Sequence, residues 1–155
     1  MRLTFIGALL AALLSAMPSA RAAPVRANCA LNHAAVSVST ESVLTTSANF
    51  VDVAESNIRF VQGGSKPGCI VISLSAEAIA GQNTAMAVRA VLDTTAVCES
   101  VYDSFVLSDA TRSVRAANFL CTDVTPGAHR IKLQFLSSGG TVVLDNRTIT
   151  VRFFR

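Results

Sequence analysis

Apolar and polar residues alternate in short runs from about residue 34 to the end of the chain. Val, Ile, Thr and Ser dominate these runs, and segments rich in Gly, Asn, Asp and Pro separate them about every eight to fifteen residues. A period of two is typical of a strand with one face on a core, because successive side chains point to opposite faces. The pattern predicts about eight or nine strands, at 34–39, 49–53, 57–62, 69–76, 85–92, 102–107, 113–120, 129–136 and 141–153.

Short strands between polar, Gly-rich turns are typical of antiparallel sheets that have one face in water. We therefore predict an all-β fold, an antiparallel β-sandwich or jelly roll, with little or no helix after a signal peptide. Residues 77–92 also suit a helix, because Ala and Met are frequent there. Gly81 interrupts that segment, and the alternation from Met86 to Leu92 favours a strand.

The last predicted strand contains an irregularity. Val142 and Leu144 hold even positions, whereas Ile149, Val151 and Phe153 hold odd ones. The buried face of a regular strand cannot change parity. An extra residue is therefore expected near residues 145–147, as a β-bulge or a short break.

The two adjacent phenylalanines near the C-terminus, Phe153 and Phe154, face opposite ways if they lie in a strand. One ring then enters the core, and the other must be exposed, covered by this chain or buried against a partner. We favour cover by another part of this chain.

The first 22 residues have the features of a cleaved secretory signal. Arg2 precedes an apolar run from Leu3 to Ala16, and residues 20–22 have the small-x-small pattern of a cleavage site. The run is about 14 residues long, shorter than the roughly 20 that span a bilayer. We expect removal of 1–22, a single sandwich domain over 23–155, a periplasmic or extracellular location, and no stable membrane insertion after cleavage.

Removing the signal also changes the charge. The chain has 13 Lys and Arg against 10 Asp and Glu, and the loss of Arg2 and Arg21 leaves 11 basic residues, a net charge of about +1. The remaining basic residues form no run, Trp is absent, and Tyr102 is the only tyrosine. Nucleic acid is not expected as a partner, because its recognition uses clustered cations and stacking aromatic rings.

Four cysteines follow the signal: Cys29, Cys69, Cys98 and Cys121. An even number in an exported chain predicts two disulfides. No Cys-x-x-Cys motif is present, so a zinc site has little support. Three connectivities are open, of which we favour Cys29 with Cys69 and Cys98 with Cys121.

Cys69 shares the parity of Ser73 and Ser75, whereas Ile70 and Leu74 form the apolar face. We therefore expect Cys69 to point away from the core at the start of a strand. It would attach another segment to the outer surface or edge, and the segment of Cys29 is the natural candidate.

The two histidines do not predict an active site. His129 has the parity of Ile131 and Phe135, which places it at the rim of the buried face. We expect it to hydrogen-bond the turn at 126–127, and we expect His33 to be a solvated loop residue. Nothing links either histidine to a particular serine, so no catalytic residue is predicted.

Other candidate sites have little support, and we expect no metal and no cofactor. Residues 63–68 lack the Lys-Ser/Thr ending of a phosphate loop, which favours a hairpin turn. The sequon at 146–148 is expected to be unused, because the short Ala-rich signal is typical of bacteria. The acidic residues occur singly, with neither a calcium-loop motif nor an evident glycosidase pair: Asp93, Glu99, Asp103, Asp109, Asp123 and Asp145.

One block of turn and strand residues resembles a known group. It comprises Pro126-Gly127-Ala128-His129, Ile131-x-Leu133-Gln134, Gly139-Gly140-Thr141 and Arg147-Thr148-Ile149-Thr150-Val151. This block is similar to the C-terminal strands of small exported bacterial β-sandwich proteins of unassigned function. The resemblance implies a sandwich fold and a bacterial source, and it implies no site residue.

Three functions are compatible with these observations. The first is a non-enzymatic exported β-sandwich that acts as a structural or protein-interaction module. The second is a small-ligand or glycan-binding domain that uses the loops at one end of the sandwich. The third is a hydrolase, which would require His129 or His33 to lie within hydrogen-bond reach of both an acid and a serine.

Overall fold

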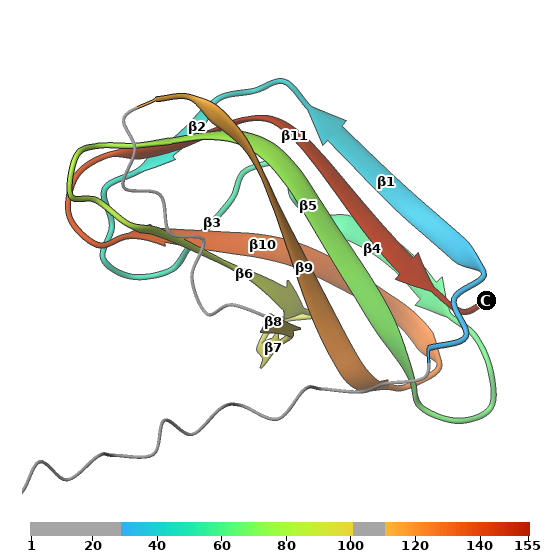
Figure 1. Ribbon diagram of the computed structural model, residues 1–155. Helices are drawn as coiled ribbons and strands as arrows, with labels where there is room; N and C mark the ends of the chain where they lie inside the picture. The colour runs from blue at the N-terminus through green and yellow to red at the C-terminus, as the bar shows by residue number, and fades with distance from the viewer. Residues whose placement is uncertain (1–28, 101–110) are drawn as a thin grey trace, which may run out of the picture.

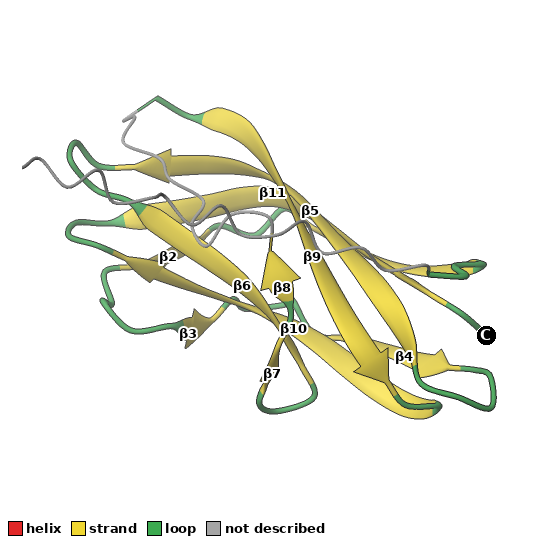
Figure 2. Ribbon diagram, turned by 60° about the horizontal axis from the view of Figure 1, so that its bottom comes forward, coloured by secondary structure: helices red, strands yellow, loops and turns green. Residues whose placement is uncertain are grey.

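A computed structural model describes residues 29–100 and 111–155. The described residues form two antiparallel sheets, which pack face to face as a sandwich (Figure 1 and Figure 2). None of them forms a helix long and apolar enough to cross a membrane. The all-β prediction is confirmed, while the predicted signal peptide and the predicted strand at 102–107 lie outside the described residues.

Sheet A is built around two long neighbouring strands. β11 (Val142–Phe153) pairs on one side with β5 (Gly68–Ala80) and on the other with β1 (His33–Ser39) and the short β2 (Val43–Thr45). β9 (Ser113–Val124) lies on the far side of β5, followed by β8 (Glu99–Ser100). Figure 1 shows β1 at the outer edge of this sheet.

Sheet B is built around β10 (Gly127–Ser137). On one side β10 pairs with β6 (Met86–Leu92), which in turn pairs with β7 (Ala96–Val97). On the other side it pairs with β4 (Ile58–Gln62) and β3 (Val51–Asp52).

The core lies between the sheets and follows the predicted alternation. In β10, Ile131, Leu133 and Phe135 are buried, and the residues between them face outward. β5 and β9 continue beyond their predicted ends, because apolar residues go on alternating toward Ala80 and Val124. β2, β7 and β8 were not predicted, since runs of two or three residues are too short to display a period.

The segment with the helix alternative, 77–92, contains the end of β5, a turn and β6, so the prediction of strands is confirmed. The expectation of a hairpin at 63–68 is wrong. This segment joins β4 in sheet B to β5 in sheet A and therefore crosses between the layers. It also covers Phe154: the Gly63 N–H donates to the Phe154 carbonyl oxygen at 2.7 Å, and an added Cβ at Gly64 would lie 3.6 Å from the ring.

The predicted bulge in β11 is confirmed. Asp145 pairs with Glu77 and Thr148 pairs with Ser75, so three steps on β11 match two on β5. Asn146 has a φ of 42°, in the left-handed region that Asn tolerates better than most residues. The extra residue turns the odd-numbered side chains that follow, from Arg147 onward, toward the interior.

Because Arg147 points inward, its guanidinium is buried, and the residue is only 1% exposed. It donates to the carbonyl oxygens of Leu144 at 3.0 Å and Ala54 at 3.4 Å, and also to the Glu41 carbonyl. Ser39 Oγ accepts a further bond at 3.1 Å. Burial lowers the pKa of Arg147 from its ordinary value, although nearby acidic side chains oppose the shift.

Two disulfides join Cys29 to Cys69 and Cys98 to Cys121, as predicted. Cys69 lies outside the continuous core cluster, as its parity indicates, but it is nonetheless buried. Cys98 lies between β7 of sheet B and β8 of sheet A, so the second disulfide fixes the point where the chain crosses between layers. These bonds indicate folding in an oxidising, non-cytoplasmic compartment.

Reduction is therefore expected to lower the melting temperature by about 10 °C or more, because each bridge contributes about 3 to 4 kcal/mol by restricting the unfolded chain. Thermal unfolding followed by circular dichroism, with and without reductant, measures this shift. An unchanged melting temperature would contradict a stabilising role for the disulfides.

Candidate functional site

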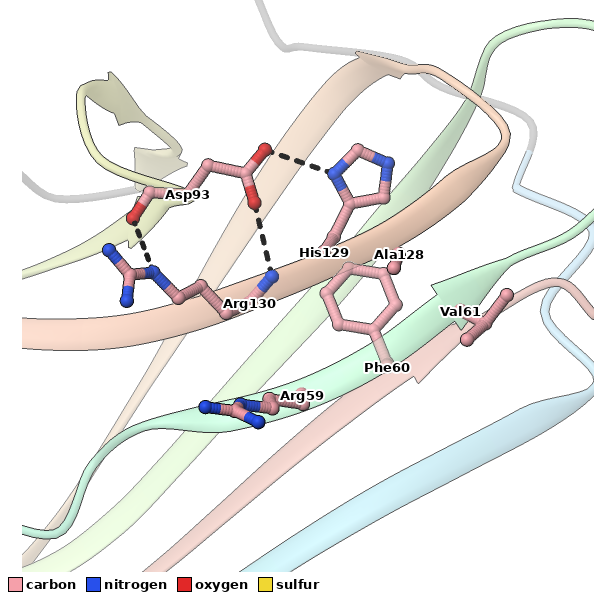
Figure 3. A pocket seen from close by; sticks show the side chains of 7 residues that line it. All are labelled: Arg59, Phe60, Val61, Asp93, Ala128, His129 and Arg130. Carbon is pink, nitrogen blue, oxygen red and sulfur yellow. Dashed lines mark hydrogen bonds and ion pairs between the residues drawn. The ribbon is translucent and has the colours of Figure 1, made fainter.

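A pocket of about 560 Å³ lies where β4 and β10 meet the turn that follows β6 (Figure 3). Its apolar part comes from neighbouring residues of the two strands, and its polar part contains two arginines and a His–Asp pair. The lining residues are Arg59, Phe60, Val61, Asp93, Ala128, His129 and Arg130.

His129 lies at the rim of the buried face, as predicted. Its side chain is 10% exposed, and its ring packs on Phe60 with the centroids 5.6 Å apart. Its Nδ1 lies 3.0 Å from Asp93 Oδ2, and its Nε2 lies 2.7 Å from the Thr125 carbonyl oxygen. The second contact confirms the predicted hydrogen bond to the turn beside Pro126, and the first was not predicted.

Asp93 directly follows β6 and is held against β10 by its backbone and its carboxylate. It adopts a φ of 56°, which Asp tolerates, and its N–H donates to the Arg130 carbonyl oxygen at 2.8 Å. Its Oδ1 accepts the Arg130 N–H at 3.1 Å, while its Oδ2 faces His129. Partial burial tends to raise the pKa of Asp93, but the hydrogen bonds from His129 and the Arg130 N–H outweigh it and hold this pKa below its ordinary value.

A hydrolase would require a histidine within hydrogen-bond reach of both an acid and a serine, and of these two groups His129 contacts only the acid among the described residues. Both ring nitrogens of His129 already face oxygen atoms, and no serine hydroxyl bonds to either within the described ranges. His33 is exposed as expected, but it begins β1 and does not lie in a loop. It bonds to Asn32 Oδ1 at 2.8 Å and lies beside the Phe153 ring, so it has no serine or acidic partner there either. The geometry indicates that His129 positions Asp93 and the turn.

The other acidic residues remain dispersed, with one exception. Asp145 is buried and forms an ion pair with Arg112. Arg112 Nη1 also lies 3.3 Å from Glu77 Oε2. Sequence reasoning missed this group because the bulge brings Asp145 inward. Asp103 and Asp109 lie outside the described residues. Across 29–100 and 111–155, no three His, Cys, Asp or Glu side chains are placed to hold a metal ion.

The outer face of sheet A differs in character from the pocket. Register partners on β1, β11 and β5 form rows across this face. One row is Val36, Thr150 and Ser73, and the next is Val38, Thr148 and Ser75. Val36 and Val38 are 59% and 69% exposed. The far edge of β1 pairs with no strand in the part of the chain that the structure describes. These rows form an uncharged surface of methyl and hydroxyl groups that ends in an open strand edge.

No protein-family model and no curated protein sequence matches this chain. Among solved structures, the chain is similar to VP2 of infectious bursal disease virus in a subviral particle, with a TM-score of 0.56 and 11% identity over 79% of this chain and 32% of that one. It is also similar to a mutant VP2 of the same virus in T=1 particles, with a TM-score of 0.57 and 12% identity over 89% and 36% of the two chains. This chain therefore spans about a third of each viral protein, and the likeness establishes the β-sandwich fold.

The ionisation of Asp93 provides a test of this local geometry. We expect its carboxyl group to titrate below 3.8, its ordinary value, in the folded protein. The stabilisation that comes from its ionised form is then complete above that value and is lost as the pH falls through the lower folded pKa. Carbon NMR of the carboxyl group measures this midpoint.

His129→Leu is expected to raise the midpoint of Asp93, because it removes one hydrogen bond to the carboxylate. Lys132→Gln is the matched control, since Lys132 bonds to Asp52 and not to Asp93. A midpoint for Asp93 at or above 3.8 in the unmodified protein would contradict the arrangement.

Proposed function

We propose that this protein is a non-enzymatic, exported β-sandwich that acts as a structural or protein-interaction module. The observation that carries the proposal is the exposed, uncharged edge of β1 together with the outer face of sheet A. Both ring nitrogens of His129 make structural contacts, with Asp93 and with the Thr125 carbonyl oxygen. These contacts support a role that does not involve catalysis.

Open strand edges expose unpaired N–H and C=O groups, and soluble proteins usually protect them with charged residues, proline or bulges. β1 has the sequence HAAVSVS, which contains no Lys, Arg, Asp, Glu or Pro. An extended segment of another protein would add to this edge through main-chain hydrogen bonds, with its side chains beside Val36 and Val38. We infer that β1 is the part of the molecule that contacts a protein partner.

The predicted signal and the two disulfides support a periplasmic or extracellular location. The resemblance of the C-terminal block supports a bacterial source. The viral proteins of similar fold are components of particles, which agrees with a structural role. A small-ligand or glycan-binding domain is the second candidate, because the pocket beside His129 lies next to the turn between β9 and β10.

A photo-crosslinking amino acid at position 38 tests the role of β1 in cells that produce the protein. We expect a discrete protein adduct from position 38 that disappears when Val36 is replaced by Lys, because a charge at the edge opposes strand addition. The adduct is detected by its mass on a denaturing gel.

Position 97 is the matched control, since Val97 is an exposed valine (52%) on the short edge strand of sheet B. No adduct from position 38, or equal labelling from both positions, would contradict the interaction proposal. Substrate-selective turnover that His129→Leu abolishes would contradict its non-enzymatic part.

A further inference from the structure

We propose that the pocket between β4 and β10 binds a small organic anion, in which an oxyanion such as a carboxylate or phosphate is carried on an apolar body. Arg59 and Arg130 would bind the oxyanion, and Val61 and Ala128 would contact the body. The inference names a ligand class for the second candidate function and is independent of the partner proposed for β1, which lies in the other sheet.

The first observation is that two arginines stand directly opposite each other. Arg59 of β4 and Arg130 of β10 are register partners, and both are exposed on the outer face of sheet B. Like charges in this position destabilise a pair of strands unless an opposite charge lies between them. A bound oxyanion would supply that charge and accept hydrogen bonds from both guanidinium groups.

The second observation is that the nearby carboxylates are engaged elsewhere. Asp93 accepts bonds from the Arg130 N–H and faces His129, while Asp52 is bonded to Lys132 and Gln134. The Arg130 side chain reaches only the Asp93 carbonyl, through Nε at 3.3 Å, so both terminal nitrogens of Arg130 stay free within the described residues.

The charge of Arg130 is nevertheless partly balanced, since it helps to lower the pKa of both Asp52 and Asp93. The side chain of Arg59 makes no hydrogen bond and no ion pair with any residue that the structure describes. The two guanidinium groups lie on the same side of the pocket, away from Val61 (Figure 3). An anionic ligand would therefore neutralise the charge of Arg59 more than that of Arg130.

The third observation is the apolar surface beside the arginines. Val61 and Ala128 are also register partners, two residues along from the arginine pair and on the same face. Two residues of a strand span about 7 Å, roughly the length of a small ring or a short alkyl chain. Val61 is 51% exposed, so a ligand body that covers it would remove apolar surface from water.

The residues beneath this surface are fixed before any ligand arrives. His129 packs on Phe60 and anchors both Asp93 and the turn at Thr125, which holds the backbone of Arg130 in place. Because the site rests on paired strands, the arginines are held close together without a rearrangement of the backbone. His129 acts here as a positioning residue and does not contact the ligand.

Amide NMR titration of the full protein, with its disulfides intact, tests the proposal with benzoate, benzyl alcohol and inorganic phosphate as probes. We expect saturable shifts from benzoate at residues 59–61 and 128–130, with a Kd at least tenfold lower than that of either other probe. Benzyl alcohol lacks the charge, and inorganic phosphate lacks the apolar body. Equal affinity for benzoate and benzyl alcohol, or no saturable shifts at these residues, would overturn the proposal.

Arg59→Gln is expected to weaken benzoate binding at least fivefold. Arg152→Gln, which replaces an exposed arginine on the outer face of sheet A, is the matched control and should leave the Kd unchanged. Equal effects of the two substitutions would show that benzoate responds only to net charge and would overturn the site. Val36→Lys should leave benzoate binding unchanged, so failure of the β1 proposal and failure of this one are distinguishable.

Discussion

The buried guanidinium of Arg147 joins three parts of the chain that are far apart in sequence. It binds the connection between β1 and β2, the connection between β3 and β4, and the bulge of its own strand. Burial of a charged group is costly unless hydrogen bonds compensate for it. Both terminal nitrogens of Arg147 make such bonds, whereas its Nε has no partner among the described residues. The same guanidinium also holds the end of β1, because Ser39 Oγ accepts a hydrogen bond from it.

Much of this architecture follows from local patterns in the sequence. The alternation of Ile131, Leu133 and Phe135 identifies β10 and its buried face, and the parity change between Leu144 and Ile149 predicts the bulge. The cysteine spacing leaves three disulfide connectivities open, and the fold contains the favoured one. The predicted hairpin at 63–68 was wrong because a turn-forming sequence does not reveal whether its flanking strands share a sheet.

The candidate sites were less predictable for a related reason. The parity of His129 predicts its place at the rim of the buried face, but its contact with Asp93 depends on how β6 and β10 align. Arg59 and Arg130 each occupy an ordinary polar position in an alternating strand, and only the register of β4 on β10 makes them neighbours. Arg147 carries no sequence signal of burial beyond its place at the bulge. Which polar side chains become neighbours on the surface of a sheet therefore depends on how the strands pair. Alternation within one strand does not specify that pairing.

The dependence of the fold on Arg147 is tested most directly by urea unfolding of Arg147→Met, with Arg152→Met as the control in the same strand. Arg147 is 1% exposed and hydrogen-bonded, whereas Arg152 is exposed. We predict a loss of about 3 kcal/mol in the free energy of unfolding for Arg147→Met, because it leaves buried carbonyl oxygens without donors, and a change below about 0.5 kcal/mol for Arg152→Met. Similar small changes for both variants would contradict the account.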